Sequence, residues 1–513
     1  MADELQTQVI SCRGGLDTAR DVLSQGQEQP GSAVRLINYE PSINGGYRRI
    51  SGYSNDYGTV TGTGKVLGVC VANGINDGIL ACRKPSAGNN YLHYWDTVLS
   101  AWVAVTTSGS PTMTGVSRVR MIPYNFSGPK VLLIDGVNPA AFYDGTTYTQ
   151  ITHASAPTDP TVGVDFQNHI FLAGDPASPY ELYFSAPFDE DDFAPASGAG
   201  SINVGFEIVQ LKSFRNELYI FGTNAIKKLS GTSVADFQLQ TVTSDLGCVA
   251  ADSVIEIGGD LLFLGPDGLR PVSGTDKIGD VNLETVSKPV QSIILDLIDN
   301  QDLTELSSVV IRQKSQFRIF FETADTIGLI GGLRLGQGGI SFEFGQLLGI
   351  NASCVASGYI GKTEFVIHGD GDGNVHRQEV GTDFDGENIF SVFQTPYYYF
   401  GDPELRKIFY KVSTYLRSEG NNEIVLAVVY DYEDSTVSNP SNYTLTNEGA
   451  AAFYNESLYN GSGVIFDGNP SPVIDTNFSG SGKSVSFRYV TNDTNASHNI
   501  QGLAILFGLG DRR

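Results

Sequence analysis

A β-hairpin pattern that occurs twice within residues 217–270 constrains this chain more than any other sequence feature. Each copy starts with a short strand that ends in a glycine, Leu218–Gly222 in the first copy and Leu261–Gly265 in the second. A tight turn then leads to a second strand, Ala225–Leu229 or Gly268–Val272. Short apolar runs bounded by Gly, Asn and Asp are typical of hairpins. Because similar units recur through most of the chain, the sequence predicts a repeat architecture built of β-hairpins.

The same kind of strand pair recurs from Lys65 to about Asn388, at a spacing near the roughly 40–50 residues of a propeller blade. We count roughly six such units, although they do not align with one another residue by residue. The sequence therefore predicts an all-β fold that contains a β-propeller of about six blades, because radial repetition leaves few exposed strand edges. Besides the two copies above, the predicted strand pairs are Val66–Ala72 with Leu80–Arg83, Lys130–Gly136 with Ala140–Asp144, His169–Gly174 with Glu181–Ser185, Phe317–Glu322 with Ile327–Leu333, and Glu364–His368 with Asn374–Gln378.

Changes in hydrophobic patterning and loop composition divide the chain into three regions. Residues 1–60 lack a sustained period, and we expect an N-terminal arm that pairs with a later part of the chain or with a neighbouring subunit. The predicted propeller occupies residues 61–390. Residues 391–513 carry alternating apolar segments between Asn/Gly/Ser/Pro loops, which predicts a C-terminal antiparallel β-sandwich domain.

Three local segments carry more specific expectations. Gln25–Ser32 reads as a linker, and Val281–Asp299 predicts a helix that starts near Ser287 and covers the flank of a blade. Gly463–Asp467 is expected to be one of the strands of the sandwich.

The composition narrows the function classes. The chain has 513 residues, with 59 Gly, 28 Phe and 24 Tyr but only 17% charged residues, which suits many short strands rather than disorder. Its formal net charge of −25 repels phosphates and argues against specific DNA binding. Like charge would still allow DNA to slide past the protein without adhering to it.

The cysteines and the N-terminus predict a chain that is made and folded in a cytoplasm. Five cysteines with no C-x-x-C pair predict buried free thiols rather than a disulfide scaffold or a zinc site. The first residues show neither a basic segment nor an apolar one, so we expect no signal peptide. No apolar run reaches the roughly 20 residues that cross a membrane, so we expect no membrane insertion.

One acidic stretch resembles the opening of a calcium loop. His368–Asn374 places Asp370 and Asp372 at alternate positions, as such a loop requires. However, Val375 and Gly381 stand where the loop has a Gly and a Glu, so a Gly-rich hairpin turn is the interpretation that we favour.

No other pattern predicts catalysis or a cofactor. The acidic run Asp189–Asp192 is expected to be a solvated loop, because adjacent carboxylates cannot all point inward. His368 and His376 are expected to pack across one hairpin. The chain has no G-x-S-x-G, P-loop or H-E-x-x-H motif. We therefore expect a protein that is not an enzyme and that has no catalytic residues, cofactor or metal.

An aromatic and basic patch is the candidate interface. Clustered aromatic residues beside arginine are typical of contacts buried between subunits or between domains, and the sequence leaves both alternatives open. The candidate residues are Tyr47, Arg48, Arg49, Tyr397, Tyr398, Tyr399, Phe400, Arg406 and Lys407.

Several segments together resemble one protein family. The most specific is the pair Gly31–Glu40 and Gly45–Tyr53, the latter reading GGYRRISGY. With the segments that follow, it resembles the tail nozzle, or head-to-tail stabilisation, proteins of short-tailed (podovirus-like) bacteriophages. The other segments are Leu182–Pro187, Asp192–Phe193, Gly198–Gly205, Leu218–Gly222, Gly247–Ala250, Gly258–Leu264, Gly371–Arg377, Gly381–Ile389 and Gly401–Lys407.

This resemblance implies a structural virion protein with a propeller and a sandwich in each subunit. Copies would form a ring, a homohexamer, below the portal and adaptor of the head–tail connector, and would extend the DNA-ejection channel. Its neighbours would be the adaptor and portal, a needle or plug, and tail spikes or fibres, and it would be located in the virion tail. DNA would pass through without specific binding.

The competing hypothesis is a β-propeller that binds or degrades carbohydrates. Ser54–Gly58 partly matches the Asp-box turn of sialidase-type propellers, but the motif occurs once and Val60 replaces its threonine. Glycan cleavage needs two converging carboxylates, and no motif selects such a pair.

Overall fold

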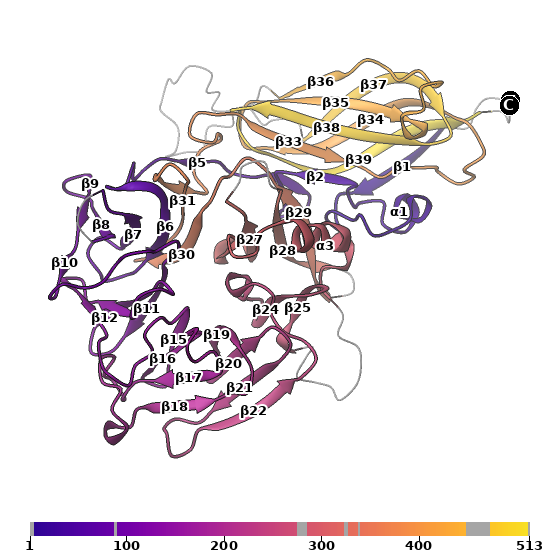
Figure 1. Cartoon of the computed structure of the whole chain (residues 1–513). Coiled ribbons are helices and arrows are strands. Elements are labelled where there is room, and N and C mark those ends of the chain that lie inside the picture. The colour runs from indigo at the N-terminus through magenta and orange to yellow at the C-terminus, as the bar shows by residue number, and fades with distance from the viewer. Residues whose placement is uncertain are drawn as a thin grey trace.

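The computed structural model describes residues 5–86, 90–273, 285–322, 327–336, 339–447 and 472–510. Nearly all of its regular structure is β-strand, and none of its sheets closes on itself within these residues. The all-β prediction is therefore confirmed. Figure 1 shows two regions, one with many short strands from indigo to rose and one with long, mainly orange and yellow strands. Two helices of seven or more residues are described, α1 (Val22–Glu28) and α3 (Gln291–Asn300), besides the short 3-10 turns η1 (Pro195–Ser197), η2 (Ala251–Ser253), η3 (Lys288–Val290), η4 (Arg312–Lys314) and η5 (Asp431–Glu433).

Seven successive strand groups make up the first region within the described residues. Each group contains a meander of three or four antiparallel strands, to which the second and seventh groups each add one further strand, and all seven hairpins that the sequence predicts occur, one in each group. Group 1 is β6 (Thr63–Val71), β7 (Ile79–Lys84), β8 (Leu92–Asp96) and β9 (Ala101–Ala104). Group 2 is β10 (Thr106–Thr107), β11 (Arg120–Asn125), β12 (Pro129–Ile134), β13 (Ala141–Tyr143) and β14 (Thr147–Gln150). Group 3 is β15 (Val162–Phe166), β16 (His169–Ala173), β17 (Glu181–Phe184) and β18 (Gly200–Asn203).

The remaining groups follow in chain order, and the last one is completed by a strand from the N-terminal region. Group 4 is β19 (Ile208–Phe214), β20 (Glu217–Gly222), β21 (Ile226–Ser230) and β22 (Gln238–Thr243), and group 5 is β23 (Ile255–Ile257), β24 (Asp260–Gly265) and β25 (Gly268–Pro271). Group 6 is β26 (Ser307–Ile311), β27 (Gln316–Phe320), β28 (Gly328–Gly336) and β29 (Gly339–Leu347), and group 7 is β30 (Cys354–Ile360), β31 (Thr363–Gly369), β32 (Val375–Gln378) and β5 (Tyr53–Ser54).

The first hairpin of three consecutive groups uses the same kind of turn. Two residues with positive φ connect the strands, Gln167 and Asn168 in group 3, Arg215 and Asn216 in group 4, and a glycine pair in group 5. Two positive φ angles define the type I′ turn, whose twist matches that of the strands it joins. The units therefore repeat in backbone conformation although their sequences differ.

The first strands of the meanders in successive groups lie against one another. β6 contacts β11, β11 contacts β15, and β15 contacts β19; η2 connects β19 to β26, β23 also contacts β26, and β26 contacts β30. Finally β30, from the last group, contacts β6 of the first group. Inner strands of all seven groups thus face a common centre.

Two sheets face each other in the second region. One contains β3 (Tyr39–Pro41), β4 (Tyr47–Arg49), β39 (His498–Leu509), β34 (Lys407–Ser418) and β37 (Val473–Gly482), with β1 (Leu5–Ser11) beside β39. The other contains β33 (Ile389–Gln394), β38 (Val485–Asp493), β35 (Asn422–Tyr430) and β36 (Tyr443–Asn447). Side chains of both sheets share one core, where Phe409 stacks on Tyr430 and the hydroxyls of Thr414 and Tyr489 lie 2.9 Å apart. The predicted strand Gly463–Asp467 lies outside the described residues.

The first sixty residues pair with both regions of the same chain. β2 (Arg35–Ile37) lies between β29 of group 6 and β33, and so joins these strands into one nine-stranded sheet. β1 and β4 pair with β39, while β5 pairs with β32. Leu36, Tyr39 and Tyr47 are buried in the core that β34, β38 and α3 also line.

The linker expectation for Gln25–Ser32 is wrong for its first half, because Gln25–Glu28 belongs to α1. The Asp21 carboxylate caps the helix by accepting hydrogen bonds from the backbone N–H groups of Leu23 and Ser24. Gly26 is buried against the Tyr397 carbonyl, where a Cβ would lie 2.2 Å from the oxygen. A polar, Gly-containing sequence thus forms a helix because of its cap and its tertiary contact.

The helix predicted near Ser287 is present as η3 followed by α3. Val290 and Ile294 are buried in the large core, and α3 contacts β25 of group 5. The five cysteines are also as predicted, since all are free and buried.

Candidate functional site

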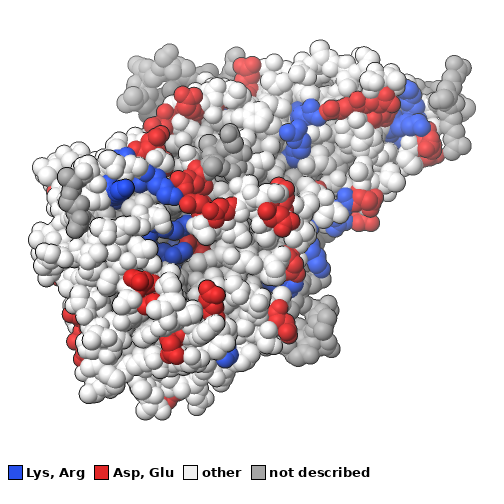
Figure 2. Space-filling model, in the orientation of Figure 1, with Lys and Arg blue, Asp and Glu red and all other residues white. Residues whose placement is uncertain are grey.

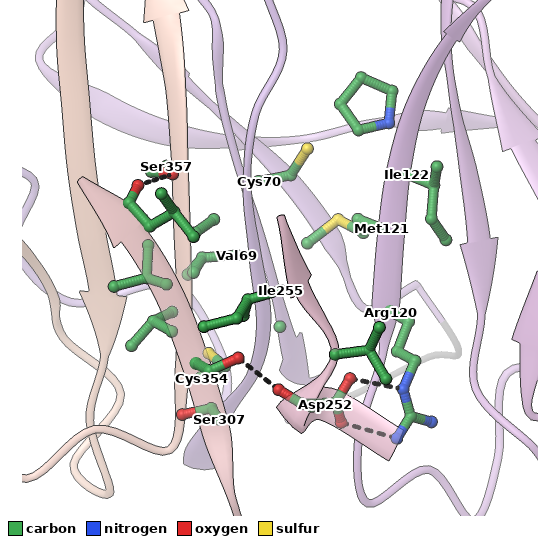
Figure 3. A pocket seen from close by; sticks show the side chains of 18 of the residues that line it. Val69, Cys70, Arg120, Met121, Ile122, Asp252, Ile255, Ser307, Cys354 and Ser357 are labelled. Carbon is green, nitrogen blue, oxygen red and sulfur yellow. Dashed lines mark hydrogen bonds and ion pairs between the residues drawn. The ribbon is translucent and has the colours of Figure 1, made fainter. Parts of the chain in front are cut away.

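Two cavities lie where the first strands of the seven groups meet. The central cavity has a volume of about 350 Å³ and is lined by residues of β6, β11, β15, β19, β23, β26 and β30 (Figure 3). The mouth cavity has about 420 Å³ and is lined by residues at the beginnings of several of these strands. Arg118, Arg120 and Asp252 line both cavities. An ion-pair cluster therefore lies where the two cavities adjoin.

The geometry of this cluster is specific. Arg120 donates two hydrogen bonds to the Asp252 carboxylate, from Nε at 2.9 Å and from Nη2 at 2.7 Å, and Arg118 Nη2 lies 3.1 Å from the same carboxylate (Figure 3). Arg118 also donates to the Thr304 carbonyl, and Arg120 to the Thr161 carbonyl. Burial opposes ionisation of Asp252, but the two guanidinium charges outweigh it and hold the pKa of that carboxyl below its ordinary value. Asp252 is therefore a satisfied anion rather than a free base.

Lys212 of β19 lines the central cavity without such partners. It is half-buried, and its side chain makes no hydrogen bond or ion pair within the part of the chain that the structure describes. Burial holds the pKa of Lys212 below its ordinary value; the charge of Arg312 adds to this effect, whereas those of Glu256, Asp165 and Asp252 oppose it. Lys212 is thus a desolvated ammonium group that no carboxylate neutralises directly.

A lysine and two glutamates form the second charged cluster, beside the mouth cavity. Lys65 Nζ lies 2.9 Å from Glu305 Oε2 and 2.7 Å from Glu322 Oε2. The two carboxyl groups also hydrogen-bond each other. Burial raises the pKa of Glu322. Burial also opposes ionisation of Glu305, but its hydrogen bonds to Glu322 and Lys65 outweigh this effect and lower the pKa of Glu305. Glycosidases hold their carboxyl groups about 5 Å or more apart, so this contact pair does not have that geometry.

The first three candidate interface residues make contacts within the chain. The buried Tyr47 hydroxyl donates to the Gly31 carbonyl at 2.7 Å. Arg49 is 1% exposed and donates to the Asp493 carboxylate at 2.8 Å. Arg48 points the other way along β4, as alternation on a strand requires, and bonds two other carboxylates.

The candidate residues after β33 are also mostly internal. Tyr398 is buried and donates to the Pro30 carbonyl at 2.6 Å, and Phe400 stacks on Phe507 with ring centres 4.5 Å apart. These side chains serve the core within the chain, which is one of the two alternatives that the sequence left open. The others are Tyr397 and Tyr399, which pack against Tyr432, Lys407, which is buried and donates to backbone carbonyls, and Arg406, which is exposed and donates to Ser481.

The calcium-like stretch forms the expected hairpin turn between β31 and β32. Asp370 accepts hydrogen bonds from the N–H groups of Asp372 and Asn374 and from the side chains of Asn374 and His376. Its oxygens are therefore occupied by the turn itself. His368 and His376 face each other across the hairpin with ring centres 4.8 Å apart, as predicted.

The acidic run Asp189–Asp192 is not a uniformly solvated loop. Glu190 is buried, 4% exposed, and pairs with Lys130 of β12. Asp192 accepts a hydrogen bond from the Ala194 N–H at 2.7 Å. The expectation is wrong for Glu190, because Lys130, 60 positions earlier in the sequence, supplies the charge that makes its burial possible.

The sequence did not indicate the residues of the central cavity. Arg118, Arg120, Lys212 and Asp252 belong to no motif, and they lie outside the hairpin pairs that apolar patterning identifies. A usable signal is a charged residue just before the predicted hairpin, as in groups 2, 4 and 5.

Comparisons with known proteins assign neither a family nor a function to this chain. No model of a known protein family matches the chain, and no curated protein matches it. Among solved structures, the computationally designed Ika8 protein is 9% identical with a TM-score of 0.33, over 63% of this chain and 98% of that one. The exo-beta-1,3-galactanase from Phanerochaete chrysosporium is 11% identical with a TM-score of 0.24, over 89% of this chain and 100% of that one. Likeness at these scores carries no conclusion about fold or function. Among the described helices, none is long and apolar enough to cross a membrane.

Proposed function

We propose that this chain is a structural subunit of a bacteriophage virion, the nozzle of a short tail, in which copies form a ring around the DNA-ejection channel. In this proposal the seven strand groups are the blades of a β-propeller, one more than the roughly six units counted in the sequence, and the two facing sheets are a β-sandwich. The contact of β30 with β6 and the completion of group 7 by β5 support the propeller, because both join the end of the repeat to its beginning.

The observation that carries the proposal is an exposed apolar sheet face beside an open strand edge. β1 pairs only with β39 among the described strands, so its other edge is available. Leu5 of β1 and Ile408 of β34 lie on either side of Gly508 and are 56% and 36% exposed. Val9 and Tyr415 continue this face and are also exposed. Large exposed apolar side chains that gather on one face mark contact surfaces.

Two further features support a passive, assembling subunit. The first sixty residues pair with both regions and share their core, which suits a part that must transmit load without a hinge. On the side of the molecule in view, Figure 2 shows Asp and Glu side chains scattered over the surface that β15–β22 form, with few Lys or Arg among them. A chain with a net charge of −25 would not retain DNA that moves past it.

The test is whether the exposed face is needed for assembly. We expect the double variant Leu5→Glu, Ile408→Glu to fold but to sediment as a monomer under conditions in which the unmodified chain assembles, alone or with the portal and adaptor proteins. Charges placed at an apolar contact must be desolvated without a partner, which opposes association. The measurement is sedimentation velocity.

The matched control is Val98→Glu, which changes a 90% exposed apolar residue in the turn between β8 and β9. This variant should assemble like the unmodified chain. Assembly by the double variant would show that the face around β1 is not the contact surface.

The second candidate function is carbohydrate binding or cleavage in the central cavity. The observation in its favour is a cavity with several convergent polar groups. Incubation with a panel of bacterial surface glycans, followed by chromatography of the products, separates the two functions, because a nozzle subunit should release no sugar.

A further inference from the structure

We propose that the central cavity is a binding site for a small organic oxyanion, a carboxylate or a phosphate, held by Lys212 and Arg312. This inference is independent of the assembly proposed above, because it concerns only the interior of a single chain. It rests on the balance of charge in the cavity, on the lack of an ion pair for either cation among the described residues, and on the size and lining of the space.

The cavity is rich in positive charge although the chain as a whole is strongly acidic. Four of its lining residues are cationic, whereas only Asp252 and Glu256 are anionic. The single carboxylate of Asp252 is shared by Arg118 and Arg120. The cavity therefore holds positive charge that its own carboxylates do not balance.

The two proposed ligand-binding cations have few partners of their own. The side chain of Lys212 makes no hydrogen bond or ion pair among the described residues. The Arg312 guanidinium makes one weak hydrogen bond, to Ser357 Oγ at 3.4 Å, while its backbone N–H donates to the Glu364 carboxylate. Arg312 is close enough to Lys212 to lower its pKa. Neither side chain forms an ion pair among the described residues, and the exposed Arg312 lines the same cavity as Lys212. Two cations so placed favour an anion that can bridge them.

The rest of the lining suits a ligand with an apolar body. Val69, Met121, Ile122 and Ile255 line the same cavity (Figure 3). A volume of about 350 Å³ is at the lower end of the range of small-molecule pockets. The site would thus take a small molecule with one anionic group, rather than a polymer.

The experiment compares three probes that share a phenyl body, namely benzoate, phenyl phosphate and benzamide, by isothermal titration calorimetry in low-chloride buffer. We expect binding of benzoate or phenyl phosphate, and the stronger of the two identifies which oxyanion the site prefers. Neutral benzamide should bind at least about tenfold more weakly, because it lacks the charge that the cations recognise.

Variants of the chain test the proposed residues. Lys212→Gln and Arg312→Gln should each weaken binding of the preferred probe by about tenfold or more, a loss expected when one charged hydrogen-bond donor is removed. The matched control Lys362→Gln, at the exposed turn between β30 and β31, should bind like the unmodified chain. Thermal unfolding should show that Lys212→Gln remains folded, with a melting temperature equal to or above that of the unmodified chain, because the variant removes a desolvated charge.

A second readout does not depend on affinity. Acetylation of lysines with acetic anhydride near pH 8, followed by peptide mass mapping, should modify Lys212, and the preferred probe should protect it. The proposal is overturned if no anionic probe binds at concentrations of about 20 mM, equivalent to less than about 2.3 kcal/mol of binding free energy. Equal binding by Lys212→Gln and the unmodified chain, or equal binding of benzamide and the anions, would also overturn it.

Discussion

Replacing Glu40 with glutamine is expected to lower the free energy of unfolding by about 3 kcal/mol or more. Glu40 of β3 is 2% exposed, and its carboxylate accepts hydrogen bonds from Arg48 at 3.1 Å, Lys314 at 2.6 Å and Arg318 at 3.1 Å. Burial opposes its ionisation, but these three cations outweigh that cost and lower the pKa of Glu40 to about 2. Without this charge, the fully buried Arg318 would keep Glu379 as its one ionic partner among the described residues.

The effect should be large because the cluster joins distant parts of the chain. Glu40 belongs to the first sixty residues, and Arg318 and Lys314 belong to group 6 or the turn that precedes β27. Glu379 follows β32 of group 7, and Arg48 reaches Glu419 at the end of β34. Removing one buried charge therefore weakens the attachment of the N-terminal residues to both regions.

The measurement is urea-induced unfolding followed by circular dichroism and by tryptophan fluorescence. Glu404→Gln is the matched control, because Glu404 pairs with Lys483 at 2.8 Å on the surface, where its side chain is 76% exposed. Its loss should cost less than about 1 kcal/mol. If Glu40→Gln were no more destabilising than this control, the cluster would not hold the regions together.

Acidification from pH 7 to pH 5 should destabilise the chain through two buried histidines, by roughly 4 kcal/mol in total. Burial lowers the pKa of His368 to about 3, with a further contribution from His376 and an opposing one from Asp370. Burial also lowers the pKa of His498 to about 3, with further contributions from Arg49 and Arg48. In the unfolded chain each histidine binds a proton near pH 6.5, whereas in the folded chain it does so only near pH 3. Stability is therefore lost as the pH falls through this window.

The histidine contribution is isolated by comparing variants at pH 7 and pH 5. In His368→Gln and His498→Gln, the loss of stability between pH 7 and pH 5 that comes from the two histidines should each time be about half as large. His153→Gln, which changes a half-buried histidine near Asp192, should behave like the unmodified chain. The comparison also cancels the change in overall repulsion that acidification causes in so acidic a protein. Equal pH dependence in all four proteins would show that neither buried histidine resists protonation.

The hairpins were predictable from the sequence because both of their strands pack into apolar surroundings. In group 4, for example, Leu218, Ile220 and Leu229 are fully buried, so a short apolar run marks each strand. Apart from β6, which was predicted as Val66–Ala72, the first strands of the meanders escaped prediction because they have one side on a cavity that contains charged groups. β19 places Lys212 between Leu211 and Phe214, and the apolar pattern that marks a strand is lost.

The candidate site was missed for the same reason, since its residues meet only through the fold. Arg120 and Asp252 are 132 positions apart and become partners only when groups 2 and 5 lie around a common centre. The candidate patch around Tyr398 was found because aromatic clusters are visible in sequence. Sequence alone could not show that Pro30, from the N-terminal residues, would cover it and make it internal.

The most direct test of the proposed nozzle is negative-stain electron microscopy of the purified chain, alone and mixed with the portal and adaptor proteins of the same virion. The account predicts rings with an open axis, in one or both samples, and their loss in the Leu5→Glu, Ile408→Glu variant. Single particles in both samples at every concentration tested would contradict it, and the central cavity would then be the place to look for the function.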